Sequence, residues 1–475
     1  MSLYLLLLII LIPSTGAFFT LSAKTDKNYS LGNIYNVSIW TMLLNTILIL
    51  YVFSLMDTSK QGIEIVEKYT WLTSPKIDIL LGVDVFSMLL LLSTNISFLI
   101  AEIFIYKKSE RSKTLIASEL LFVSLLNGYF IAADIISFYI FFAAVSIPLI
   151  ILISTYASIS KKNILVRFSL YNIIGVLLLM VATIMIFNHK ENNIPLNMAG
   201  NVNIVGSLEY FVWLSIFLAF ISRIPVWPFH YWISAISSGI KNPLVFIVSN
   251  LIPLMGLYGF TRFWPNTVPK TISVYAPVFE VVCVVTMVFI ALISLSNKDM
   301  RYKLFAYSTV YYLLFLIGIF MPTNTLRQNI GYSLFSYTII ITVLSFLISH
   351  VEEQKKKLDI YSSAGLLCYM PKVSKSLSLF ILAGIGLPIT PLFWNNFIII
   401  SEIFNYNLML GVFVMLSLMI IGVSFLEELY KQKDKTYATF SNVLISDMPS
   451  YQFVMCLACM IVLFLSFFKP LWFVF

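Results

Sequence analysis

Long apolar segments follow one another through the whole sequence, and they constrain the fold more than any other feature. A helix needs about 20 apolar residues to cross a hydrocarbon core about 30 Å thick, so we expect about fourteen membrane helices. Of the 475 residues, 60% are hydrophobic and 11% are charged, which is far from the composition of a soluble globular protein. We therefore predict an all-α, polytopic membrane protein that forms a single membrane domain over residues 1–475. The expected spans are residues 3–21, 34–56, 81–106, 114–132, 134–157, 164–188, 206–238, 243–263, 272–296, 302–320, 328–350, 374–402, 408–429 and 451–472.

Charge and residue counts narrow the class further. The net charge of +8 comes mainly from lysine and arginine in loops that follow odd-numbered spans, so it is a signal of membrane orientation. By the positive-inside rule, both termini lie on the side away from the cytoplasm or the mitochondrial matrix. The four cysteines and three histidines indicate neither a disulfide framework nor a metal-ligand cluster. We expect no cofactor, no nucleic-acid partner and no small molecule bound by this chain alone.

The seventh expected span is interrupted near its middle by Arg223, Pro225 and Pro228. Each proline removes a backbone donor and clashes with the preceding turn, so the helix breaks and carbonyl groups are freed at membrane depth. Such backbone is tolerated in a bilayer where it is buried in protein or lines a polar cavity. Because a bare arginine at mid-membrane costs from about 3 to more than 10 kcal/mol, we expect Arg223 to have a buried partner or water. A snorkelling side chain or a purely structural ion pair is the competing interpretation.

The pattern Pro225-x-x-Pro228 is repeated as Pro388-x-x-Pro391 in the twelfth expected span. The two segments lie five spans apart, and an odd separation gives them opposite orientations across the membrane. Inverted repeats with one broken helix each are how many transporters build a site near the bilayer midplane. Chance alone could produce two such matches among 17 prolines, so the motif gives weak support for a repeat.

Several longer motifs resemble those of a known family. They are LGVDVFSMLLLLST at 81–94, ADIISFYIFFAAVSIP at 133–148, RIPVWPFHYW at 223–232, MGLYGFTRF at 255–263, LFAYSTV at 304–310 and GLPITPLFWNNF at 386–397. In order and spacing they resemble the chain 4 subunits of mitochondrial NADH:ubiquinone oxidoreductase, respiratory complex I, which are cation/proton antiporter-like membrane subunits. The sequence also resembles the paralogous chain 2 subunits, but the FYIFF and GLP-x-T patterns favour chain 4.

The resemblance implies a fourteen-helix fold with two inverted five-helix repeats, helices 4–8 and 9–13, in which helices 7 and 12 are broken. The implied divisions are helices 1–3 over residues 1–110, a first repeat over 111–265, a second repeat over 266–430 and a C-terminal helix over 431–475. The implied protein is a membrane-arm subunit of a proton-pumping enzyme, without a redox centre of its own. Its implied partners are other membrane-arm subunits and lipids, in the mitochondrial inner membrane, with both termini on the intermembrane-space side.

Family members pass protons along a central row of buried charged groups and water, and the first repeat of this chain departs from that pattern. The family's lysine of helix 7 falls on Arg223, so a cation is kept. The glutamate of helix 5 falls on Ala143 and the lysine of helix 8 falls on Leu254. Alanine and leucine exchange no proton, and arginine holds its proton more firmly than lysine. A complete proton path of the family type is therefore in doubt.

The second repeat departs from the pattern in a different way. The glutamate of broken helix 12 falls on Asn396, and the two expected histidines fall on Tyr312 and Tyr337. These side chains can bond water and relay a proton transiently. Buried tyrosine also serves packing alone, and packing is the favoured role.

Three further side chains are candidates for the proton pathway. His230 follows the break and either titrates near neutrality or bonds the freed carbonyls. Asp134 opens the fifth span and either serves the pathway or caps the helix N-terminus. Glu209 precedes Arg223 by about 21 Å along a helix. The carboxylates within spans that could partner Arg223 are Asp134, Glu119, Glu102, Glu209, Glu280 and Glu402.

Three functions remain compatible with the sequence. The first is a complex I subunit that contributes to, or scaffolds, proton translocation coupled to electron transfer from NADH to ubiquinone. The second is a standalone cation/proton antiporter, but this needs titratable carboxylates where the chain has Ala143 and Asn396. The third is a structural membrane subunit that has lost transport, which the missing charges favour.

Overall fold

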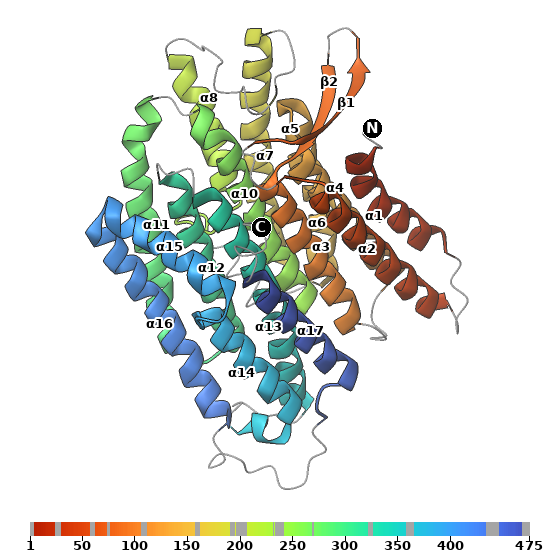
Figure 1. The fold of residues 1–475 in the computed structure, drawn as a ribbon, viewed down its shortest axis with the longest axis vertical. Helices are drawn as coiled ribbons and strands as arrows, with labels where there is room; N and C mark the ends of the chain where they lie inside the picture. The colour runs from red at the N-terminus through yellow and green to blue at the C-terminus, as the bar shows by residue number, and fades with distance from the viewer. Residues whose placement is uncertain are drawn as a thin grey trace. The chain divides into compact units, whose positions relative to one another are not determined.

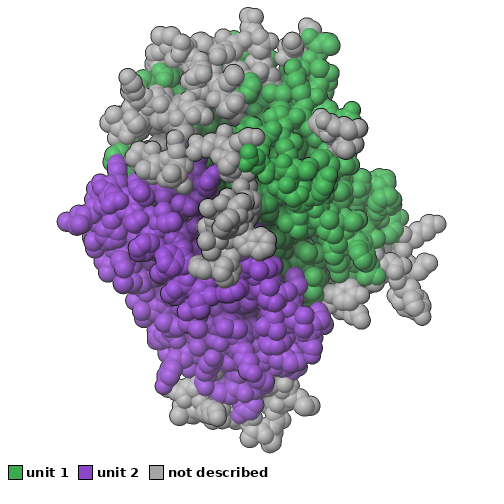
Figure 2. Space-filling view, viewed as in Figure 1, with its two compact units in different colours: residues 1–232, 248–280 green, residues 233–247, 281–475 purple. Residues whose placement is uncertain are grey.

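The computed structural model describes most of the chain and divides it into two units. One unit is Met1–Trp232 with Val248–Glu280, and the other is Ile233–Ile247 with Val281–Phe475, coloured separately in Figure 2. The predicted repeat boundaries at residues 111, 266 and 431 remain predictions. The described residues are 4–23, 30–57, 62–73, 77–105, 112–156, 162–190, 195, 207–230, 232, 242–267, 270–321, 326–357, 365–433 and 446–467.

Helices make up nearly all of the described chain (Figure 1). Eleven helical segments among the described residues are long and apolar enough to cross a membrane, so the polytopic helical class is confirmed. The count of fourteen crossings and the inverted repeats stay predictions. The helices are α1 (Leu5–Ser22), α2 (Ser30–Ser54), α3 (Val85–Ile105), α4 (Lys113–Ile131), α5 (Ile135–Ala144), α6 (Ser146–Tyr156), α7 (Lys162–Lys190), α8 (Ser207–Ile221), α10 (Pro243–Thr267), α11 (Lys270–Ser296), α12 (Met300–Phe320), α13 (Leu326–Lys357), the 3-10 turn η3 (Leu366–Tyr369), α14 (Pro371–Ile385), α15 (Pro391–Tyr406), α16 (Leu408–Lys433) and α17 (Ser450–Phe467).

Both predicted helix breaks are present. Helix α8 ends at Ile221, and the next turn is tightened by bonds from the Arg223 amide to the Phe220 carbonyl and from the Ile224 amide to the Ile221 carbonyl, each 3.0 Å. Such i to i+3 bonds use carbonyls that an α-helix end leaves free. Residues 233–238 of the predicted seventh span lie outside the described residues.

The second break separates α14 from α15. Gly386 ends α14 with φ of 106°, a left-handed conformation in which only glycine carries no steric penalty. Its amide and the Leu387 amide both bond the Leu382 carbonyl, at 3.3 and 3.2 Å. Pro391 then occupies the first turn of α15, where its missing donor is not needed.

Within the described part of the chain, a two-stranded hairpin departs from the all-helical expectation. Strand β1 (Ile65–Leu72) pairs antiparallel with β2 (Ile77–Val83), so the third predicted span begins at Val85 and not at residue 81. The Glu67 carboxylate of β1 accepts hydrogen bonds from the Leu6 and Leu7 amides, at 3.0 and 3.3 Å. A carboxylate at free amides stabilises a helix N-terminus, so the hairpin anchors the start of α1.

A row of buried asparagines joins the first four helices. Pro13 lacks an amide hydrogen, so the Ile9 carbonyl of α1 has no helical donor, and Asn127 of α4 donates to it at 3.4 Å. Asn95 of α3 donates to the Asn127 side-chain oxygen at 2.8 Å and accepts from Asn45 of α2 at 2.7 Å. All three asparagines are fully buried. In a bilayer such polar contacts between helices fix which faces meet.

The central asparagine gives a stability prediction. Replacing Asn95→Leu removes both contacts and leaves the Asn45 amide and the Asn127 oxygen without these partners, at a cost of about 1–3 kcal/mol. We therefore expect the detergent-solubilised variant to unfold at a lower midpoint temperature than the parent protein. The control is Ser14→Ala, whose exposed hydroxyl bonds only the carbonyl of Leu11 in its own helix. This change should alter the free energy of unfolding by at most about 0.5 kcal/mol, so the midpoint temperature should stay close to that of the parent protein. Equal midpoints for the two variants would contradict the assignment.

Candidate functional site

Arg223 lies in the turn that follows α8, and its side chain is fully buried. One terminal guanidinium nitrogen donates to the Asn172 side-chain oxygen of α7. The other donates to the Ser146 hydroxyl of α6 at 3.0 Å and to the Phe142 carbonyl of α5 at 3.4 Å. The guanidinium carbon also lies 4.4 Å from the centroid of the Phe142 ring, within the range of a cation–π interaction. The expected buried partner of Arg223 is therefore present.

The partners of Arg223 are neutral, which differs from the carboxylate expected from the sequence. No carboxylate contacts this guanidinium within the described part of the chain. The break between α5 and α6 at Val145 explains how neutral groups suffice, because it leaves the Phe142 carbonyl and the Ser146 hydroxyl facing the cation. Hydrogen bonds to a charged donor contribute about 1.5–3 kcal/mol each, so three of them offset a large part of the desolvation cost.

Asp134 has the capping role that the sequence left open. It is the N-cap of α5, and its carboxylate accepts from the Ser137 amide at 2.8 Å and from the Ser137 hydroxyl at 2.5 Å. It also accepts from the Leu80 amide of β2 at 2.9 Å. Asp134 thus joins the hairpin to the start of α5. Its membership of a proton pathway remains a prediction.

Glu209 and His230 lie on either side of Arg223 in the chain. Glu209 is half-buried in the first turn of α8, where a carboxylate suits the helix N-terminus. His230 is half-buried beyond the break, and its Nδ1 atom has no hydrogen-bond partner among the described residues. The structure does not bring either side chain into contact with the Arg223 guanidinium.

The second unit contains a cluster of four fully buried tyrosines. Tyr312 and Tyr337 meet edge to face, with ring centroids 5.1 Å apart, and Tyr337 stacks on Tyr311 at 5.6 Å. Tyr307 and Tyr311 both donate from their hydroxyls to the Gly384 carbonyl, at 3.1 and 2.7 Å. That carbonyl belongs to the last turn of α14, where no amide of the helix is available. The cluster therefore satisfies the backbone at the second break.

One turn before Tyr307, Lys303 extends the same face of α12 to a buried ion pair. Its ammonium donates to the Ser424 carbonyl of α16 at 2.9 Å and lies 3.5 Å from the Glu428 carboxylate.

Asn396 is buried in α15, and its side-chain oxygen has no hydrogen-bond partner among the described residues. Among the described residues, Asn396 takes no part in the hydrogen bonds that Tyr307 and Tyr311 make to the Gly384 carbonyl.

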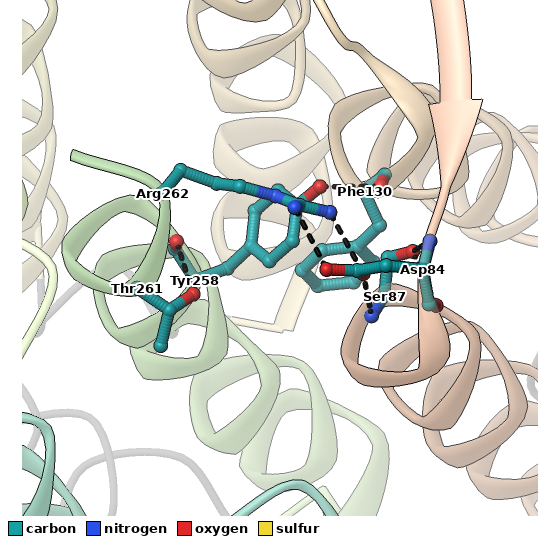
Figure 3. A network of polar contacts seen from close by, with 6 residues as sticks. All are labelled: Asp84, Ser87, Phe130, Tyr258, Thr261 and Arg262. Atoms are coloured by element: carbon teal, nitrogen blue, oxygen red, sulfur yellow. Dashed lines mark hydrogen bonds and ion pairs between the residues drawn. The ribbon is translucent and has the colours of Figure 1, made fainter. Parts of the chain in front are cut away.

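A second arginine forms the most complete ion pair of the first unit. Figure 3 shows Arg262 of α10 turned toward Asp84, which precedes α3. Two guanidinium nitrogens donate to the two carboxylate oxygens, each at 2.8 Å, the bidentate geometry that arginine favours. The Tyr258 ring lies 4.8 Å from the guanidinium carbon and its hydroxyl donates to the Phe130 carbonyl at 2.7 Å. Asp84 also accepts from the Ser87 amide, so it caps α3 as well.

Sequence reasoning missed Arg262 and Asn172. Arg262 lies inside the motif MGLYGFTRF, and Asp84 lies inside LGVDVF, so two charges of opposite sign within apolar motifs were available as a signal. Asn172 is a polar residue within an apolar span, whereas only carboxylates were expected as side-chain partners of Arg223. Neither pairing can be read from spacing, because 178 and 51 residues separate the partners.

The fold and the site define a polytopic helical membrane protein with broken helices and a buried cation at one break. A sequence model of the family described as NADH:quinone oxidoreductase/Mrp antiporter, TM matches residues 132–422. This match spans both breaks and more than half of the chain, so the chain belongs to that family. The predicted resemblance is thereby confirmed.

Named relatives agree with this assignment, and solved structures share the fold. NADH-quinone oxidoreductase subunit M of Rickettsia typhi is 26% identical over 422 residues, covering 87% of this chain and 84% of the relative. NADH-ubiquinone oxidoreductase chain 4 of Marchantia polymorpha is 24% identical over 427 residues, covering 89% and 85%. A chain of respiratory complex I from Thermus thermophilus matches with a TM-score of 0.86 at 19% identity, covering 98% of this chain and 96% of that chain. A chain of an archaeal membrane-bound sulfane sulfur reductase matches with a TM-score of 0.81 at 18% identity, covering 98% and 95%.

The ion pair between Asp84 and Arg262 gives a second stability prediction. Each side chain is mostly buried, with 19% and 13% exposed, and removing one partner of a buried pair costs about 3–5 kcal/mol. We expect Asp84→Asn or Arg262→Gln to lower the thermal midpoint strongly. The double change Asp84→Asn with Arg262→Gln should cost less than the sum of the two single changes.

An exposed ion pair of the hairpin supplies the control for this cycle. Lys68 lies 2.9 Å from Asp78, but the lysine side chain is 58% exposed, so Lys68→Gln should cost at most about 1 kcal/mol. If the losses of stability at Asp84 and Arg262 were additive, the two side chains would not be coupled. Losses as small as that of Lys68→Gln would likewise contradict a stabilising ion pair.

Proposed function

We propose that this protein is the chain 4, or subunit M, type membrane subunit of an NADH:quinone oxidoreductase. The observation that carries the proposal is the family match over residues 132–422, which includes both helix breaks and Arg223. The Rickettsia and Marchantia relatives are similar over more than four fifths of both chains, so the proposal concerns the whole chain. The subunit holds no redox centre, and electron transfer from NADH to the quinone occurs elsewhere in the complex.

The proposed role in proton translocation is narrower than that of a complete pump. The first unit keeps a cation at the break, but neutral side chains and a carbonyl hold it in place. Guanidinium groups stay protonated through the physiological pH range, so Arg223 acts as a fixed positive charge that orders nearby water and dipoles. Ala143 and Leu254, which occupy positions where the resemblance implies titratable groups, transfer no proton. Proton passage through this chain is accordingly reduced.

In the second unit, the chain has Tyr312 and Tyr337 where the resemblance implies histidines. Tyr307, Tyr311, Tyr312 and Tyr337 are fully buried and in ring contact. Phenol groups relay protons by exchanging hydrogen bonds rather than by carrying charge. Tyr307 and Tyr311 donate hydrogen bonds to the Gly384 carbonyl, so packing and backbone hydrogen bonding already account for these two side chains. Among the described residues, the Asn396 side-chain oxygen and the Tyr337 hydroxyl are buried without a hydrogen-bond partner, so both are water-binding candidates of this unit.

A structural subunit that has lost transport is the second candidate. The neutral partners of Arg223 and the loss of titratable groups at Ala143 and Leu254 favour it. Both candidates require assembly with other membrane-arm subunits and contact with lipids. The proposed location is the mitochondrial inner membrane, with both termini on the intermembrane-space side. Large exposed apolar side chains along α16, such as Leu408, Met409 and Val423, suit a surface in contact with lipid or with a neighbouring subunit.

Assembly is the first prediction of this proposal. Gently solubilised membranes are separated on a native gel, the band that oxidises NADH is identified by activity staining, and its peptides are sequenced by mass spectrometry. We expect this chain in that band. Migration in a separate band without NADH oxidation would contradict the proposal and favour a free antiporter.

Arg223 gives the prediction about mechanism. Arg223→Ala removes the fixed charge and the donors to Asn172 and Ser146, so we expect fewer protons pumped per NADH. Arg223→Lys restores a positive charge and should recover part of the loss. The control is Arg167→Ala, which removes an exposed cation of α7. Unchanged assembly and pumping in Arg223→Ala would exclude Arg223 from any pathway.

A further inference from the structure

Glu280 carries a buried carboxyl group within the apolar helix α11. The site described above does not use this carboxyl. Only 1% of the residue is exposed. It is the eleventh residue of α11 and shares one helical face with other buried residues. That face comprises Ala276, Glu280, Cys283, Met287 and Ser294, whereas Val278, Val281 and Val285 on the opposite face are at least half exposed. The side chain of Glu280 is therefore directed into protein and not toward lipid.

The surroundings of Glu280 supply no counter-charge. Its Oε2 atom has no hydrogen-bond partner among the described residues. The adjacent Phe279 packs on Phe217 of α8, with ring centroids 4.1 Å apart, and Phe217 lies 5.3 Å from Phe260 of α10. No described lysine, arginine or histidine forms an ion pair with Glu280. The residue that precedes Glu280 is thus part of an aromatic, apolar cluster, and the carboxyl has no described counter-charge.

An ionised carboxylate without a partner is strongly disfavoured in such a place, whereas a neutral carboxyl needs only hydrogen-bond partners. We propose that Glu280 is a proton-binding site in the membrane interior, neutral at rest, which releases and regains one proton during turnover. This inference rests on the proposed function for its role in turnover. The step is a simple exchange, in which the carboxyl gives its proton to water and the carboxylate later takes one back. Glu280 would then supply a titratable carboxyl in a unit that has lost one at the position of Ala143.

Resting protonation is tested on the assembled complex without any mutation. Dicyclohexylcarbodiimide is an apolar reagent that takes the proton of a carboxylic acid onto nitrogen while the carboxyl oxygen adds to its carbon, and the adduct rearranges to a stable acylurea. Treated membranes are digested and the modified peptides identified by mass spectrometry. We expect an acylurea on Glu280. Asp134 is a matched control, since it is equally buried but both of its oxygens accept hydrogen bonds from amides, so it should stay unmodified.

The exchange during turnover is tested by substitution. Glu280→Gln keeps the shape but binds no proton, and Glu280→Asp keeps the carboxyl. We expect Glu280→Gln to lower the number of protons pumped per NADH at an unchanged rate of NADH oxidation by the assembled complex, and Glu280→Asp to restore part of the loss. Glu427→Gln, at an exposed carboxylate paired with Lys431, should leave pumping unchanged.

Three results would overturn the proposal. They are an unmodified Glu280, equal modification of Glu280 and Asp134, and unchanged pumping in Glu280→Gln. The labelling result does not depend on which complex contains the chain, so a failed assembly test and a failed test of Glu280 are distinguishable.

Discussion

The burial of the Arg223 guanidinium is the constraint on which the first unit depends. Hydrocarbon offers no hydrogen-bond partner, so a cation at a helix break persists only where protein groups surround it. The α5–α6 junction, α7 and the turn after α8 each supply one part of this arrangement. The apolar helices determine that the chain lies in a membrane, and the contacts of Arg223 join α5, α6 and α7 to the end of α8.

The two helix breaks differ in the chemistry of the side chains around them. At the first break, the charged Arg223 side chain donates to neutral acceptors of other helices, including the Phe142 carbonyl of α5. At the second break, the hydroxyls of Tyr307 and Tyr311 donate to the Gly384 carbonyl, and Gly386 ends α14 in a left-handed conformation. One break therefore retains a permanent charge, and the other is neutral. This difference is consistent with a subunit in which the two halves no longer contribute equally to proton movement.

Patterns that act within one segment could be predicted from the sequence. The helical class, the approximate spans and both breaks follow from the length of apolar segments and from the positions of proline and glycine. The need for a buried partner of Arg223 follows from the cost of an unpaired charge. The identity of that partner depends on tertiary packing, and Asn172 is 51 residues away. The hairpin was missed because segments 65–72 and 77–83 are short and lie between strong helical signals. The pairing of Asp84 with Arg262 was missed because only the fold brings the two residues together.

Density maps of the assembled complex are the best test of whether neutral groups hold Arg223 as a fixed charge. Maps are needed in the resting state and during NADH oxidation, at a resolution that shows side-chain orientation. We expect the same contacts of the guanidinium with Asn172, Ser146 and the Phe142 carbonyl in both states. A guanidinium that pairs with a carboxylate, or that changes partners between the two states, would contradict it.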